Sequence, residues 1–194
     1  MFSAIQLIFN PAPTWTRIIT AGPRYGLILA VYLLPLLLVT GAAEGYALVQ
    51  FAGGPSQWEQ SVLLTVDKVV RYEVLRLGLC LAAVFLGAQM VRWVSESFDF
   101  KPPFLRCFTL GAYGLGPFFL ARLLNCVPGL NPWIGWGVGW VVSIHVLYQG
   151  VGIALEPQQT KGFGMLILSV LVFSFMTVFV HILSLMAVQG KIPL

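Results

Sequence analysis

Five long apolar stretches, separated by short polar breaks, occupy most of the chain between about Leu27 and Val188. A helix needs about 20 apolar residues to cross the roughly 30 Å hydrocarbon core of a bilayer, and each stretch reaches about that length. Backbone amides and carbonyls in lipid must be hydrogen-bonded within the segment, so the stretches are expected to be helical. The pattern predicts an all-α integral membrane protein with five transmembrane helices.

Composition agrees with this prediction. Hydrophobic residues make up 58% of the chain and charged residues 9%, whereas soluble domains carry about 25% charged residues. A chain of 194 residues leaves little sequence for a separate soluble domain, so we expect one membrane domain over residues 1–194. The predicted spans are approximately 25–43, 77–94, 104–124, 132–155 and 163–188.

Two further segments have an amphipathic pattern. Apolar residues cluster between Phe2 and Phe9, and Asn10 with the prolines after it ends that cluster, so we expect an N-terminal segment lying at the membrane surface. Trp15 then falls where an interfacial aromatic residue is expected. Between Val62 and Leu77, valines recur at helical spacing while charged residues take the other faces, which predicts an amphipathic helix leading into the second span.

The distribution of lysine and arginine predicts the orientation of the chain, because positive charge is retained on the cytoplasmic side. Six such residues fall on one side when the five spans alternate: Arg17, Arg24, Arg92, Lys101, Arg106 and Lys161. We therefore expect a cytoplasmic N-terminus and an outside C-terminus. The net charge of +4 is explained by topology, and nothing indicates nucleic-acid binding, which needs a basic patch on a soluble face.

The third span contains a predicted kink. Glycines at 111, 114 and 116 precede Pro117, which removes one helical hydrogen bond and clashes with the preceding turn. His145 falls near the middle of the fourth span, and an ionisable residue inside the membrane is by default a candidate for function. One hypothesis is a polar cavity lined by Tyr113, Pro117, His145, Tyr148 and Gln149. The plainer interpretation is that His145 makes one interhelical hydrogen bond.

Two other sets of residues are candidate sites. Glu73, Arg76 and Arg122 fall at matching depth near the outer ends of spans two and three, which predicts an outer ion-pair cluster. Such a cluster either holds the helices together or binds an anion or a lipid headgroup, and the sequence favours the structural role. The small residues Gly135, Gly139 and Ser143 lie four apart and predict a helix-packing face, within the bundle or across a dimer.

The chain shows no pattern for a metal ion or a cofactor. Cys80, Cys107 and Cys126 do not have the spacing of a metal site, a redox motif or a disulfide framework. The glycines around residue 137 lie inside an apolar span and not between a strand and a helix, so they do not form a phosphate-binding loop. We expect no metal and no cofactor.

Three landmarks together resemble the Yip-domain family of multi-pass membrane proteins. They lie before span one, in the kink of span three, and at the end of span four, and consist of Asn10, Pro11 and Trp15; Gly111, Tyr113, Gly114 and Pro117; and Leu147, Tyr148, Gly150, Glu156, Pro157, Gln158 and Lys161. The resemblance implies five spans and a cytoplasmic N-terminus. In eukaryotic members it implies contact with prenylated Rab-type GTPases, but their Asp-Leu-Tyr-Gly-Pro signature is missing here. The chain is more similar to short bacterial members, which implies an inner-membrane location.

Two hypotheses for function follow. The first is a non-enzymatic scaffold or adaptor that binds membrane lipids and partner membrane proteins or associates with itself. The alternative is a small transporter, channel or lipid-translocating protein that uses a cavity near Pro117 and His145, as broken helices do in transporters. We do not expect an enzyme, because acid–base chemistry needs paired groups within hydrogen-bond reach and the sequence suggests such a pair only where Glu73 meets arginines.

Overall fold

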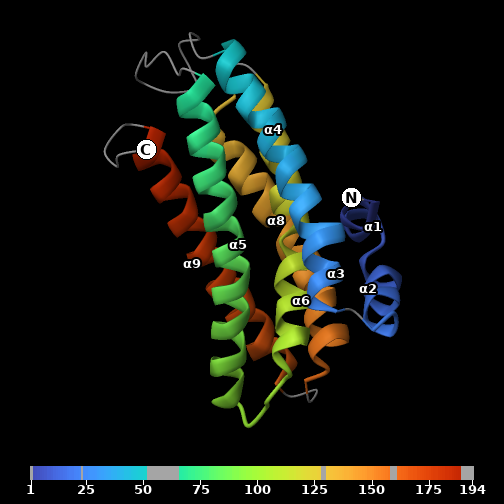
Figure 1. Cartoon of the computed structure of the whole chain (residues 1–194). Helices are drawn as coiled ribbons and strands as arrows, with labels where there is room; N and C mark the ends of the chain where they lie inside the picture. Colours follow the sequence, from blue (N-terminus) through green and yellow to red (C-terminus); the bar gives the residue numbers. More distant parts are fainter. Residues whose placement is uncertain (1, 23, 52–65, 128–129, 158–160, 189–194) are drawn as a thin grey trace.

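The computed structural model describes residues 2–22, 24–51, 66–127, 130–157 and 161–188, and in these ranges the chain is helical without strands. Figure 1 shows a bundle of long helices that run up and down beside one another. Five helices are long and apolar enough to cross a membrane: Tyr25–Gln50, Val66–Glu96, Phe104–Cys126, Trp133–Leu155 and Gly162–Ser184. The predicted class, an all-α membrane protein with five spans, is confirmed.

The first span is longer than the sequence predicted. It begins with the short helix α3 (Tyr25–Leu27), widens into a π-helical segment η1 (Ile28–Leu33), and continues as α4 (Leu34–Phe51). The predicted span, 25–43, ended one residue before Glu44. Glu44 instead lies inside the helix and is buried, with its carboxylate bonded to two arginines of neighbouring helices.

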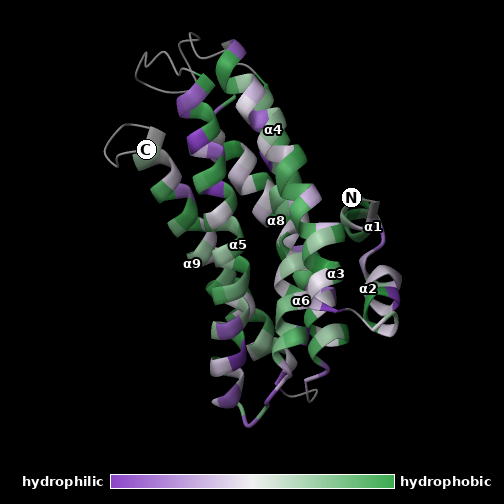
Figure 2. Ribbon diagram, in the orientation of Figure 1, coloured by the Kyte–Doolittle hydropathy of each residue, from purple (hydrophilic) through white to green (hydrophobic). Residues whose placement is uncertain are grey.

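The second span is one continuous helix, α5 (Val66–Glu96), which packs against α4, α6 and α9. Its charged residues gather towards its two ends and its middle is apolar, as Figure 2 shows. The amphipathic stretch predicted to lead into this span is therefore part of the same helix from Val66 onward. The first residues of the predicted stretch, 62–65, lie outside the described residues.

The third span is broken where the sequence predicted a kink. Helix α6 (Phe104–Gly114) ends one residue before α7 (Gly116–Ala121), and a 3-10 turn η2 (Arg122–Cys126) completes the span. Pro117 lies in the first turn of α7, where its missing N–H is tolerated. The next amide, of Phe118, donates to the hydroxyl oxygen of Ser143 at 3.1 Å, so a neighbouring helix satisfies the broken backbone.

Spans four and five complete the bundle. Helix α8 (Pro132–Gly150) is capped by the side chain of Asn131, and it continues into a π-helical segment η3 (Val151–Leu155). Glu156, at φ +51°, takes a left-handed conformation that ends the span. Helix α9 (Gly162–Val188) packs along α5, and its buried Phe173 fits against Gly87 and Gly111, where a β-carbon would overlap the ring.

The N-terminal segment forms two short helices, α1 (Phe2–Phe9) and α2 (Pro11–Thr20), that pack on the side of the bundle against α7 and α8 (Figure 1). Ala4 and Leu7 are fully buried. Trp15 is also buried, and its indole N–H donates to the carbonyl oxygen of Val146 at 3.0 Å. The predicted interfacial position of Trp15 is therefore wrong: the indole belongs to the helix-packing core.

Candidate functional site

The most polar part of the bundle interior lies near the end at which α4 finishes and α5 begins. Glu44 of α4 is 2% exposed, Arg76 of α5 is 7% exposed and Arg122 of η2 is 5% exposed. Each residue lies within three helical turns of an end of its helix. Three chain segments therefore place charged side chains at the same depth in the bundle. Ionisable groups in such a setting must be paired, because the surroundings cannot solvate them.

Glu44 is the centre of this group. Its Oε2 accepts from Nε of Arg122 at 2.8 Å, and its Oε1 accepts from Nδ2 of Asn125 at 3.0 Å and from Nη1 of Arg76. Arg76 also donates to the hydroxyl oxygen of Tyr72 at 2.6 Å. Both carboxylate oxygens are thus bonded to donors from two other helical segments, and they tie α4 to α5 and η2.

Glu73 extends the group towards the surface of the bundle. Its Oε2 accepts from Nη2 of Arg122 at 2.9 Å, so Arg122 bridges two carboxylates. We call Glu44, Tyr72, Glu73, Arg76, Arg122 and Asn125 the ion cluster. Two carboxylates face two guanidinium groups, so the formal charges of the ion cluster cancel. This balance offsets part of the desolvation cost of burying them.

The ion cluster differs from the predicted arrangement in its principal acid. The sequence pointed to Glu73, Arg76 and Arg122, and the structure places all three in one group, but Arg76 is bonded to Glu44 and not to Glu73. The predicted first span, 25–43, stopped one residue short of Glu44. The signal available was the apolar sequence on both sides of it, which makes Glu44 an acid inside a span.

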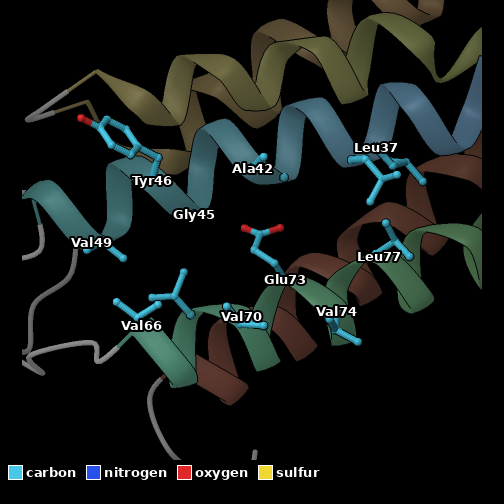
Figure 3. A pocket seen from close by; sticks show the side chains of 13 residues that line it. Leu37, Ala42, Gly45, Tyr46, Val49, Val66, Val70, Glu73, Val74 and Leu77 are labelled. Carbon is cyan, nitrogen blue, oxygen red and sulfur yellow. The ribbon is translucent and has the colours of Figure 1, made fainter.

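A lateral groove of about 520 Å³ runs between α4 and α5 beside the ion cluster. Figure 3 shows aliphatic side chains of both helices along the groove and the carboxylate of Glu73 pointing from α5 towards α4. Two glycines of α4 make room here. A β-carbon on Gly41 would lie 2.8 Å from Oε2 of Glu73, and one on Gly45 would lie 3.3 Å from Val69. The small residues therefore permit the approach of the carboxylate.

The residues of the predicted polar cavity are not brought together. Pro117 is buried, and Tyr113 stacks on Tyr32 with ring centroids 4.0 Å apart. His145 and Tyr148 instead lie on an exposed face of α8, where Tyr148 is 60% exposed. Gln149, also on α8, is half-buried. The structure thus places His145 on the outside of the bundle and the kink on the inside.

The predicted helix-packing face lies inside the bundle. A β-carbon on Gly139 would approach Ala121 to 2.9 Å, and one on Gly135 would approach the backbone oxygen of the same residue to 3.3 Å. Ser143 completes this face by accepting the hydrogen bond of the Phe118 amide. These small residues therefore let α8 pack closely on α7 and η2 of the same chain.

At the opposite end of the bundle, two connections between spans are linked by charged side chains. Arg106, at the start of α6, pairs with Glu156 after η3 at 3.1 Å. Lys161 donates to the carbonyl oxygen of Phe98, after α5, at 2.6 Å. Within the described ranges, no three histidine, cysteine, aspartate or glutamate side chains are grouped so as to hold a metal ion.

Comparison with known sequences gives one match. The family model of the Yip1 domain matches residues 5–180, which is most of the chain and includes the five spans up to the last turns of α9. No curated protein and no solved structure matches the chain.

Proposed function

The chain belongs to the Yip1-domain family of multi-pass membrane proteins, and on that premise we propose that it is a non-enzymatic membrane adaptor. One observation carries the proposal: His145 and Tyr148 project from the exposed face of α8 near the middle of the span Trp133–Leu155. Lipid tails offer no hydrogen-bond partner at that depth, so polar groups there favour contact with protein.

The shape of the same face supports a helix as the partner. Gly152, two turns beyond His145, has no atom within 4 Å of the position of a β-carbon. An open glycine on a span permits the backbone of another helix to approach closely. We propose that this face of α8 and η3, defined by His145, Tyr148 and Gly152, binds a transmembrane helix of another membrane protein that presents a polar side chain to the imidazole.

The transport hypothesis receives less support from this geometry. A transport pathway through the kink needs Tyr113 and His145 to line a common space, and Tyr113 packs against Tyr32 and Trp15 while His145 faces outward. The ion cluster is likewise bonded to itself and ties helices together. Both features suit a rigid framework more than an alternating-access device.

Site-specific photo-crosslinking in native membranes tests the adaptor function. A photoreactive residue at Tyr148 is expected to give an adduct of one defined mass with another membrane protein, and His145→Leu is expected to weaken that adduct. The matched control is Leu171 on α9, which is 62% exposed and should give no such adduct. Equal labelling from both positions, or an adduct with twice the mass of this chain, would overturn the proposal.

We also propose a bacterial inner-membrane location with the N-terminus in the cytoplasm. Arg24, Lys101 and Lys161 all lie at the end of the bundle where α3, α6 and α9 begin, as the retention of positive charge in the cytoplasm requires. Cysteines introduced at Arg24 and at Asn131, on opposite ends of the bundle, give the test. Because Cys126 is partly exposed at the same end as Asn131, both variants are made in a Cys126→Ser background. A membrane-impermeant thiol reagent added to whole cells should then label Asn131→Cys and leave Arg24→Cys unlabelled. The reverse pattern would invert the proposed orientation.

A further inference from the structure

The groove between α4 and α5 opens towards the bilayer. Leu38 and Val49 of α4 and Val70 and Val74 of α5 line it, and all four side chains are exposed at the surface of the bundle. Its volume, about 520 Å³, lies within the range of roughly 300–1,000 Å³ that is typical of ligand pockets. An aliphatic groove on a membrane-spanning surface is accessible to lipid chains without any opening of the bundle.

The wall of the groove carries a carboxylate with unused bonding capacity. Oε2 of Glu73 accepts from Arg122, whereas Oε1 is buried and has no hydrogen-bond partner among the described residues. As the carboxylate partner of Arg122, Glu73 can only accept hydrogen bonds. The side chain is 16% exposed and lines the groove, so its carboxylate is within reach of a molecule bound there. A donor in the groove would complete its bonding.

The depth of Glu73 limits what that donor can be. Helix α5 is roughly 46 Å long at 1.5 Å per residue, which exceeds the hydrocarbon core by about 16 Å. Glu73 lies about two turns, or roughly 10 Å, from the start of the helix at Val66. In a centred helix this is the boundary where lipid chains join their glycerol backbone, and phosphate and headgroup amines lie farther out.

We propose that the groove binds one glycerolipid with a free glycerol hydroxyl, such as a diacylglycerol, whose acyl chain lies along the aliphatic wall and whose hydroxyl donates to Oε1 of Glu73. The acyl chain of the lipid covers the apolar side chains that line the groove. At the same depth, its hydroxyl gives the unpartnered oxygen of Glu73 a hydrogen bond. The match of donor to acceptor selects for the free hydroxyl, because an ester or ether in its place puts a second acceptor against the carboxylate.

Native mass spectrometry of the full chain in detergent tests this with two lipids that differ only at the donor. The probes are 1,2-dioleoylglycerol and its 3-acetyl ester, each titrated against the protein. A hydrogen bond to a charged group corresponds to roughly a tenfold to hundredfold change in affinity, so the acetyl ester is expected to bind at least about tenfold more weakly. Equal retention of the two lipids, or retention of neither, would overturn the assignment.

Two variants locate the site. Val70→Trp fills the groove without touching the ion cluster and should abolish selective retention of dioleoylglycerol, while the control Leu86→Trp, on an exposed part of α5 outside the groove, should leave it unchanged. Glu73→Ala should make the two lipids bind alike. If Val70→Trp instead converts a dimer to a monomer, the groove holds a second copy and the proposal fails. Crosslinking through α8 is independent of this result, so failure here does not bear on the adaptor function.

Discussion

Glu44 and Arg122 lie 78 residues apart in the sequence and are joined by a 2.8 Å hydrogen bond from Nε to Oε2 in the buried interior of the bundle. The bond links the first span to the end of the third. Because the same carboxylate also binds Arg76 of the second span, one acid holds three spans in a fixed rotation about their axes.

Replacing the central acid should destabilise the bundle strongly. Glu44→Gln leaves two arginines with a single remaining carboxylate, and breaking a buried ion pair by removing one partner costs about 3–5 kcal/mol. We expect a marked fall in the thermal midpoint in detergent. The matched control is Glu96→Gln, an exposed glutamate of α5, which should stay close to wild type. Equal midpoints for the two variants would mean that the cluster contributes little to stability.

The two arginines should not be equally sensitive to lysine. Arg122 uses its fork to bridge Glu44 and Glu73, whereas Arg76 binds one carboxylate and a tyrosine hydroxyl. A lysine ammonium cannot reproduce the planar fork, so Arg122→Lys should lower the unfolding free energy by about 1.5–3 kcal/mol and Arg76→Lys by less. Denaturation in mixed micelles measures both. A larger loss for Arg76→Lys would contradict the bridging role.

The docking of α1 and α2 should depend on Trp15. Trp15→Phe keeps most of the ring packing and removes the hydrogen bond to Val146, which costs about 0.5–1.5 kcal/mol, whereas Trp15→Ala should cost about 3–5 kcal/mol. We expect faster amide exchange in α2 in this order: wild type, phenylalanine, alanine. Thr16→Ala, at an exposed position of the same helix, is the control. Uniform exchange across the series would show that the indole does not anchor the segment.

Two glycines of α8 should differ in how far substitution by valine lowers the stability of the protein. A β-carbon on Gly139 lies within 3.1 Å of the backbone of Phe118, whereas Gly137 has no atom within 4 Å. Gly139→Val should therefore destabilise the protein by about 1–3 kcal/mol through overpacking, and Gly137→Val should not. Thermal unfolding of the pair decides this. Equal losses would indicate an effect of valine on the helix itself.

The number and approximate positions of the spans, and the kink, could be predicted because hydropathy and proline act locally. Apolar runs correspond to helices, and the break at Leu115 falls between Gly111 and Pro117 as their backbone chemistry requires. The rotation of each helix about its axis could not be predicted, since no span has a strongly one-sided pattern when both lipid and core are apolar. This is why His145, central in its span, was expected inside and lies outside.

The same reason explains why the position of Glu73 could be predicted and that of Glu44 could not. Glu73 was recognisable at the edge of a charged segment, but Glu44 has no charged neighbour in the sequence, and its partners lie on other helices. Trp15 was recognisable as an aromatic residue near the membrane. Its bond to Val146 depends on how α2 folds back along the fourth span, which no local pattern encodes.

That bond has a consequence for the biogenesis of the protein. Ribosomes deliver Trp15 early, while the carbonyl it needs belongs to a segment 131 positions later. Helices α1 and α2 can therefore reach their final packed position against α8 only after four of the five spans have entered the bilayer. A tag or truncation at the N-terminus thus disturbs a late step of assembly, the docking of α2 on the fourth span, although it alters the segment that is synthesised first.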